Sequence, residues 1–177
     1  MPPRVLSAWR AAQGGRPEPS TCTERHCHDT QRPSSLSAAR AEAFQGLLDL
    51  SATIHKNSLG TRLVDLVLLR VSQINGCAFC IDMHWRDLIR HDADPRHLNA
   101  LAGWREAPFF SERERAALRW AEIVTAMPHS DASDEEFATL RAHFSDAEIA
   151  ELGFVIAVIN AWNLLNVSFR NPVPETV

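Results

Sequence analysis

Two cysteines and a histidine near the middle of the chain constrain its fold more than any other feature. They lie in the segment 74–85, where Cys77, Cys80 and His84 stand at positions i, i+3 and i+7. In an α-helix this spacing places the three side chains on one face. The segment therefore predicts a helix that carries a dithiol at its start and an imidazole one turn further along.

This arrangement favours redox chemistry. A thiol attacks only as its thiolate, so its pKa must fall below the usual value of about 8.5. We expect Asn75 or Gly76 to cap the helix, which would place Cys77 and Cys80 beside free N–H groups and the positive end of the helix dipole. His84 is one turn from Cys80 and can accept its proton. A zinc site and a pair of inert buried cysteines are the alternatives that the pattern leaves open.

Composition indicates a single helical domain and argues against some functions. The chain has 177 residues, of which 45% are hydrophobic, with 7 glycines and no tyrosine. Its net charge of −4 argues against a nucleic-acid-binding surface. No apolar segment typical of a signal peptide follows the first residues, and the cysteines do not form a secreted disulfide pattern. We therefore expect a cytoplasmic protein.

The chain divides into two parts of different composition. Residues 1–34 are rich in Pro, Arg, Ser and Gly and show no helical or strand periodicity, so we expect a flexible leader. Residues 35–177 form the expected helical domain. The leader contains a group of side chains that could bind a metal, which we interpret as scattered polar residues and not as a site: Cys22, His26, Cys27 and His28.

Apolar periodicity and capping patterns predict six to seven helices in the domain. Their expected ranges are 37–54, 61–74, 77–91, 95–102, 111–126, 133–144 and 145–169. Three Ser-x-x-Glu capping boxes begin at Ser111, Ser133 and Ser145. The last helix is strongly apolar, but Gly153 and three asparagines interrupt it. We expect it to be a core helix or an oligomer contact, with no membrane span.

Asp65 is the one acidic residue in the apolar helix 61–74. A carboxylate on a buried helix needs a partner or a raised pKa. One hypothesis is a structural ion pair with Arg62 or Arg70, or simple exposure near the start of the helix. The other is that Asp65 orients His84, as the third member of a catalytic group does.

The motif and its flanks resemble the carboxymuconolactone decarboxylase-like superfamily, and more narrowly its AhpD-like alkylhydroperoxidase branch. The resemblance rests on Leu66–His84, which contains Cys-x-x-Cys-x-x-x-His, and is supported by the runs 104–115 and 159–163. It covers about residues 36–172 and leaves the leader outside.

The resemblance implies an all-α bundle that forms homotrimers or homohexamers and acts as a thiol peroxidase without haem, flavin or metal. Cys80 would be the peroxidatic thiol and Cys77 the resolving one. His84 would pass the proton through water, under the influence of an acid twelve positions before Cys77. That acid is usually Glu, whereas here it is Asp65. Some relatives carry a histidine where this chain has Phe79.

In that mechanism an organic hydroperoxide oxidises Cys80 to a sulfenic acid, Cys77 closes a disulfide, and an external dithiol reduces it. In the family this dithiol can be a lipoyl group on a partner protein. Neither a membrane nor a nucleic acid is an expected partner. The alternatives are a disulfide reductase or redox sensor without peroxidase activity, a lactone decarboxylase that does not use the dithiol, and a zinc-binding module.

Overall fold

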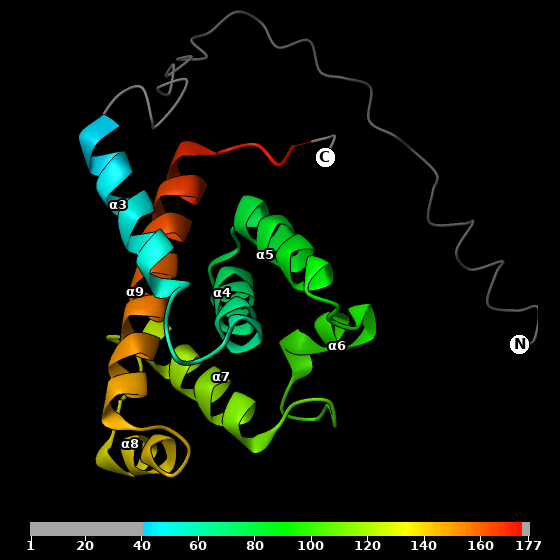
Figure 1. Cartoon of the computed structure of the whole chain (residues 1–177), viewed down its shortest axis with the longest axis vertical. Helices are drawn as coiled ribbons and strands as arrows, with labels where there is room; N and C mark the ends of the chain where they lie inside the picture. Colours follow the sequence, from blue (N-terminus) through cyan, green and yellow to red (C-terminus); the bar gives the residue numbers. More distant parts are fainter. Residues whose placement is uncertain (1–40, 175–177) are drawn as a thin grey trace, which may run out of the picture. The chain divides into compact units, whose positions relative to one another are not determined.

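The computed structural model describes residues 41–174, and the predicted leader with its boundary lies outside this range. Within it the chain forms seven α-helices and one short 3-10 helix, with no strand (Figure 1). The elements are α3 (Ala41–Ile54), α4 (Thr61–Asn75), α5 (Ala78–Arg90), α6 (Pro95–Asn99), η1 (Leu101–Gly103), α7 (Glu112–Thr125), α8 (Asp134–Arg141) and α9 (Asp146–Phe169). The predicted all-α fold is confirmed. The single helix expected over 95–102 is divided into α6 and η1.

Helix α4 lies in the middle of the bundle and contacts α5, α7 and α9 (Figure 1). Its apolar residues point in every direction, as expected of a helix surrounded by others. One face packs with α7 and α9 through Val64, Val67 and Val71. The opposite face packs with α5, α6 and η1 through Leu66 and Leu69. Burial on both sides fixes α4 as the support from which the next segment projects.

Two of the three predicted capping boxes form in full. Ser111 and Ser145 each accept a hydrogen bond from the N–H of the glutamate three residues later, and that glutamate bonds back to the serine N–H. The box at Ser133 is only half formed, so this prediction was wrong in part. Ser133 accepts from the Glu136 N–H. The Glu136 carboxylate instead pairs with Arg119 of α7, because an arginine fork offers it a charged, two-point partner.

Helix α9 is long and apolar enough to cross a membrane by length and composition, with a mean hydropathy of 1.6. The expectation that Gly153 and the asparagines leave too short an apolar run for a span was therefore wrong, whereas the expected core helix is observed. Its packing against α3, α4 and α7 identifies it as a core helix of this bundle, with Val155, Ile156 and Ile159 buried. Its asparagines also find partners inside the protein, as described below.

Candidate active site

The two cysteines lie at the junction between α4 and α5. Gly76 ends α4 in a left-handed conformation, with φ of 66°, which favours glycine because it has no Cβ. Cys77 is then the N-cap of α5: its sulfur accepts a hydrogen bond from the Cys80 N–H at 3.3 Å. The expectation that Asn75 or Gly76 caps this helix was wrong, because Gly76 is used to end the previous one. Cys80 still lies in the first turn, as predicted.

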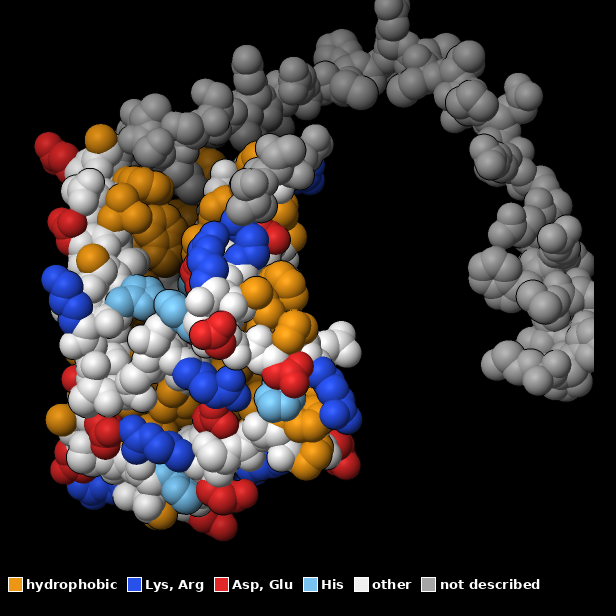
Figure 2. All heavy atoms as spheres, turned by 45° about the vertical axis from the view of Figure 1, so that its right-hand side comes forward, with side chains coloured by type: hydrophobic (Ala, Val, Ile, Leu, Met, Phe, Trp, Pro, Cys, Tyr) orange, Lys and Arg blue, Asp and Glu red, His pale blue; other side chains and the backbone are white. Residues whose placement is uncertain are grey.

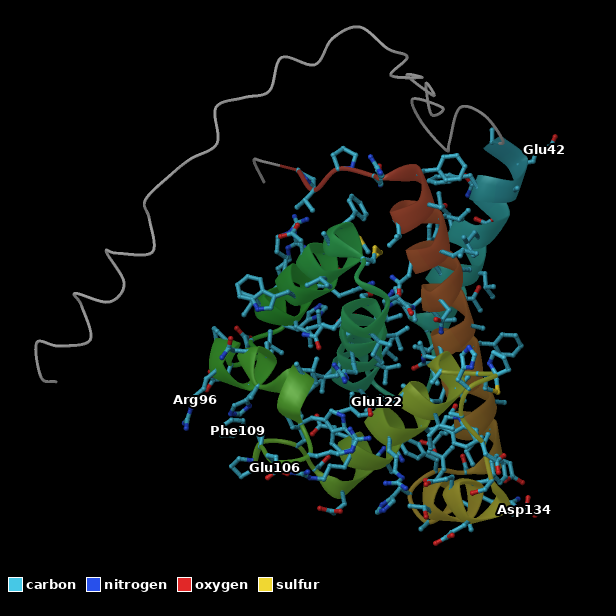
Figure 3. The ribbon with its side chains drawn as sticks, turned by 180° about the vertical axis from the view of Figure 1, so that it is seen from behind. Glu42, Arg96, Glu106, Phe109, Glu122 and Asp134 are labelled. Carbon is cyan, nitrogen blue, oxygen red and sulfur yellow. A yellow bond between two sulfur atoms is a disulfide. The ribbon has the colours of Figure 1, made fainter. Side chains whose placement is uncertain are left out.

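Cys77 and Cys80 are joined by a disulfide, with their Cα atoms 5.3 Å apart. Figure 3 shows this disulfide in yellow at the start of α5. Both cysteines are buried, at 1% and 0% exposure. The structure thus represents the oxidised state of the dithiol, in which the bond joins the N-cap to the third residue of the helix.

A cavity of about 400 Å³ lies against Cys80. Helices α3, α4, α5 and α9 contribute its walls, and most of the lining side chains are apolar. These are Phe44, Leu48, Ile54, Leu68, Phe79, Met83, Ile159 and Trp162, with Ser51, His55, Cys80, His84, Asn166 and Asn171 as the polar or reactive members. Figure 2 shows hydrophobic side chains around a hollow on this face, with histidine side chains beside it. The cavity is of a size and polarity suited to a small organic molecule.

His84 lies one turn after Cys80 and lines the same cavity, as the predicted register requires. Its side chain is 5% exposed, and neither ring nitrogen has a hydrogen-bond partner among the described residues. Burial disfavours the charged ring and lowers its pKa to about 4 in this disulfide form. His84 is therefore a neutral imidazole with a free lone pair, which is the state needed to accept a proton.

Asp65 is buried on α4, and its surroundings differ from both hypotheses made from the sequence. Arg62 pairs with Glu114 and Arg70 with Glu122, so neither arginine is its partner. The ionisable side chain in contact with it is His91 at the end of α5, with Nδ1 3.4 Å from Oδ2 but outside hydrogen-bond geometry. Burial raises the pKa of Asp65. No hydrogen bond joins Asp65 to His84 in the described structure.

Asparagines of α9 hold the end of α4 and reach the disulfide. Asn163 donates to the Ser72 hydroxyl at 3.1 Å, and Asn75 donates to the side-chain oxygens of Asn160 and Asn163 at 2.8 and 3.0 Å. Asn166 donates to the Cys80 sulfur at 3.4 Å. A donor to sulfur favours the thiolate over the thiol and so lowers the thiol pKa once the disulfide is reduced.

The structure thus brings Cys80 and His84 together in one cavity, with Cys77 bonded behind Cys80 and Asp65 outside the lining. Sequence reasoning missed two residues of the site. These are Asn166 and His55, which both line the cavity. The helical spacing of Asn160, Asn163 and Asn166 was a usable signal for α9 facing the motif; no local pattern marks His55.

The zinc alternative finds no further ligands in the part of the chain that the structure describes. Cys77 and Cys80 are bonded to each other, and no group of three His, Cys, Asp or Glu side chains gathers in residues 41–174 in a way that could hold a metal ion. The histidines and cysteines of the leader lie outside the described residues.

Known proteins place the chain in a family. Residues 41–122 match the carboxymuconolactone decarboxylase family. The uncharacterised protein YdfG of Bacillus subtilis is 32% identical over 130 residues, covering 73% of this chain and 88% of YdfG. A solved structure from Agrobacterium tumefaciens, the protein ATU0492, is 39% identical with a TM-score of 0.79, over 82% of this chain and 99% of that chain. ATU0492 is of unknown function and has been suggested to be the antioxidant defence protein AhpD.

A second structure is similar in fold. The alkylhydroperoxidase AhpD core of an uncharacterised peroxidase-related protein from Ralstonia eutropha has a TM-score of 0.71 at 20% identity, over 78% of this chain and 74% of that chain. These likenesses agree with the helical bundle described above. The chain therefore belongs to the carboxymuconolactone decarboxylase family and has its AhpD-like all-α fold.

Proposed function

We propose that this protein is a thiol-dependent peroxidase that reduces organic hydroperoxides, with Cys80 as the attacking thiol and Cys77 as the resolving one. The observation that carries the proposal is the position of Cys80. It is the cysteine on the cavity wall, beside a neutral His84 and under a hydrogen bond from Asn166. Cys77 lies behind it, bonded to it, and does not line the cavity.

The cycle starts from the reduced dithiol. His84 accepts the Cys80 proton, and the thiolate attacks the terminal oxygen of the hydroperoxide. The O–O bond breaks, Cys80 becomes a sulfenic acid, and the alkoxide takes up one proton to leave as an alcohol. The Cys77 thiol then displaces water from the sulfenic acid and closes the disulfide that the structure contains. An external dithiol, such as a lipoyl group on a partner protein, reduces this disulfide by thiol–disulfide exchange. It becomes a disulfide itself, and Cys77 and Cys80 are again thiols.

Asp65 keeps a place in this proposal as an acid that acts on the site from a distance. The structure records no direct hydrogen bond between Asp65 and His84, so its effect would pass through the field of its charge or through water. We therefore expect a moderate effect when this residue is changed. The use of a reducible dithiol also favours the cytoplasm, where reductants for it are present.

Peroxide consumption by the full chain tests the proposal. We expect loss of cumene hydroperoxide with dihydrolipoamide as donor, and no turnover in Cys80→Ser. Cys77→Ser should allow one round and leave a sulfenic acid on Cys80 that dimedone labels. Cys22→Ser/Cys27→Ser is the matched control and should keep wild-type activity. Unchanged turnover in Cys80→Ser would contradict the proposal.

A second candidate is a disulfide reductase or redox sensor, which the missing hydrogen bond between Asp65 and His84 favours. It predicts a disulfide that dithiols reduce readily, together with no peroxide turnover. Asp65→Asn separates the two functions further. If Asp65 supports the thiolate, its neutralisation should shift the pH midpoint of Cys80 alkylation, whereas a purely structural Asp65 leaves that midpoint unchanged.

A further inference from the structure

The reaction at Cys80 requires protons to move between a buried site and water. Cys80 and His84 are buried, and the ring nitrogens of His84 have no partner in the described structure. Asp65, the acid expected to serve His84, is directed to His91 instead. The alkoxide formed from a hydroperoxide in the cavity also needs a proton donor on its own side. Among the residues assigned so far, only His84 could be this donor, after it has taken the Cys80 proton, and burial disfavours the charged form of its ring.

His55 is a candidate because it belongs to the cavity and to the surface at once. His55 directly follows the last residue of α3 and is exposed to solvent. Its side chain lines the same cavity as Cys80 and His84. These three are the titratable side chains of the cavity lining. An imidazole in this position can exchange protons with water outside and with a substrate inside.

The turn that carries His55 is held in place on both sides. Lys56 N–H donates to the Thr53 carbonyl at 3.0 Å, and Leu59 N–H donates to the Asn57 side chain at 3.0 Å. Ser58 donates to Glu151 of α9 through its N–H and its hydroxyl, at 3.0 and 2.8 Å. The backbone of the turn that carries His55 is therefore held by the contacts of its neighbours.

Helix α3 itself is docked on α9 through one tryptophan. Trp162 N–H donates to the Ser51 hydroxyl at 2.8 Å, and its ring packs edge-on against Phe44 with centroids 5.4 Å apart. All three side chains line the cavity. The contacts that build the cavity wall thus also hold the helix whose end carries His55.

The charges around His55 come from two other helices as well as its own turn. Lys56 is its neighbour in the chain. The charge of His55 acts on Asp65 of α4 and on His84 of α5, lowering the pKa of each, and Asp87 of α5 acts on the same two groups in the opposite sense. Helix α9 contributes Asn166 to the cavity lining, and this side chain carries no charge. His55 is therefore electrostatically coupled to the buried base beside Cys80.

We propose that His55 is the general acid of this site: its side chain faces the cavity, and in its protonated form it favours the Cys80 thiolate and donates the proton that the departing alkoxide takes up. This assignment rests on the proposed peroxidase function. The proton that His84 removed from Cys80 then passes back through the cavity to the neutral His55 ring. The balance is one hydroperoxide and one thiol converted to one alcohol and one sulfenic acid, with no net gain or loss of protons.

Two variants of the full chain test the assignment, His55→Ala and His55→Gln, with His129→Ala as the control in an exposed turn. We expect kcat/KM for cumene hydroperoxide to fall about tenfold in both, which is below the roughly 10²- to 10⁴-fold typical of general acids because water can partly substitute. Added imidazole should restore His55→Ala in proportion to its concentration and leave His129→Ala unchanged. An unchanged rate, or a loss that imidazole does not restore, overturns the assignment.

A second readout does not depend on peroxide turnover. The rate of alkylation of reduced Cys80 by iodoacetamide, followed against pH, gives the midpoint of its thiol titration. We expect this midpoint to move upward in His55→Gln and to stay in place in His129→Ala, because a cation facing the thiolate is lost only in the former. No movement overturns the assignment even if the wild type shows no peroxidase activity, so this result is separate from failure of the proposed function.

Discussion

At the scale of single residues, His84 and Asp65 are both removed from water, and this has opposite effects on their pKa values. Burial disfavours the charged form of each group, which lowers the pKa of the imidazole and raises that of the carboxyl. Both groups therefore favour the neutral state. A neutral imidazole is ready to act as a base, whereas a carboxyl that resists ionisation is a weak electrostatic support. For this reason we expect replacement of His84 to reduce activity more than replacement of Asp65 does.

The lowered pKa of His84 predicts how stability depends on pH. The unfolded chain binds a proton at this histidine below about pH 6.5, whereas the folded oxidised protein binds it only near pH 4. Stability is therefore complete above pH 6.5 and is lost as the pH falls toward 4, by up to ~3 kcal/mol at about 1.4 kcal/mol per pKa unit. We expect His84→Gln to lack this part of the pH dependence. Urea unfolding of the oxidised proteins between pH 7.5 and 4.5 measures it.

The quantity to compare is the slope of the free energy of unfolding against pH, because His84→Gln also changes packing at a buried position and so shifts the absolute stability. The two stability curves should converge as the pH falls. Parallel curves over the whole range would mean that His84 binds protons equally well in the folded and unfolded chain, and would contradict the neutral state inferred for it. His129→Gln serves as the control and should follow the wild type.

At the scale of elements, the junction between α4 and α5 is held from across the bundle by α9. Asn163 lies buried between Ser72 and Asn75, and donates to one while it accepts from the other. The Cys77 N–H in turn bonds to the Ser72 carbonyl at 3.1 Å. The turn with the disulfide is therefore attached to a helix more than eighty residues away in the chain.

Replacement of Asn163 should weaken this junction. In Asn163→Ala the half-buried Asn75 amide loses one acceptor and the buried Ser72 hydroxyl loses a donor, and buried polar groups left without partners cost about 1–3 kcal/mol. We expect that loss in the free energy of unfolding, together with faster reduction of the disulfide by dithiothreitol. Asn160→Ala, at a half-buried position of the same helix, should cost less. Equal effects of the two changes would show that Asn163 has no special role.

Much of this element structure could be predicted from the sequence, because local contacts decide it. Ser111 and Ser145 cap their helices, and Asp94 accepts from Arg96 N–H at the start of α6, as their spacing indicates. What the sequence could not supply were contacts between distant elements. The interaction of Asp65 with His91, of Asn166 with Cys80, and the placement of His55 in the cavity all depend on how helices pack.

At the scale of the whole molecule, one face of α9 remains without a partner in the described chain. Phe154 and Leu164 are 60% and 72% exposed, and Ala157 and Ala161 stand between them. The spacings of three, four and three residues form a stripe along one side of the helix, as in helices that pair with another helix. Small residues in the middle allow close approach, and large ones at either end provide apolar area.

This stripe carries our proposal that the protein forms a homo-oligomer, with α9 of a second copy as the occupant. Burial of a large apolar side chain contributes roughly 1.5–3 kcal/mol, and each contact between copies would bury such residues from both chains. We expect the full chain to be a trimer or hexamer by light scattering. Leu164→Glu should dissociate it toward a single chain of 19.8 kDa, because a carboxylate cannot be buried there without a partner.

The control is Trp85→Glu, which places the same charge on an exposed apolar residue of α5, outside the stripe. It should leave the mass unchanged. A wild type that is already monomeric, or a Leu164→Glu variant that keeps the mass of the wild type, would contradict the α9 interface. Because Asn163 and Asn166 lie on the buried side of the same helix, dissociation should also loosen the disulfide turn. Faster reduction of Cys77–Cys80 in Leu164→Glu, at unchanged helical content, would show that assembly supports the site.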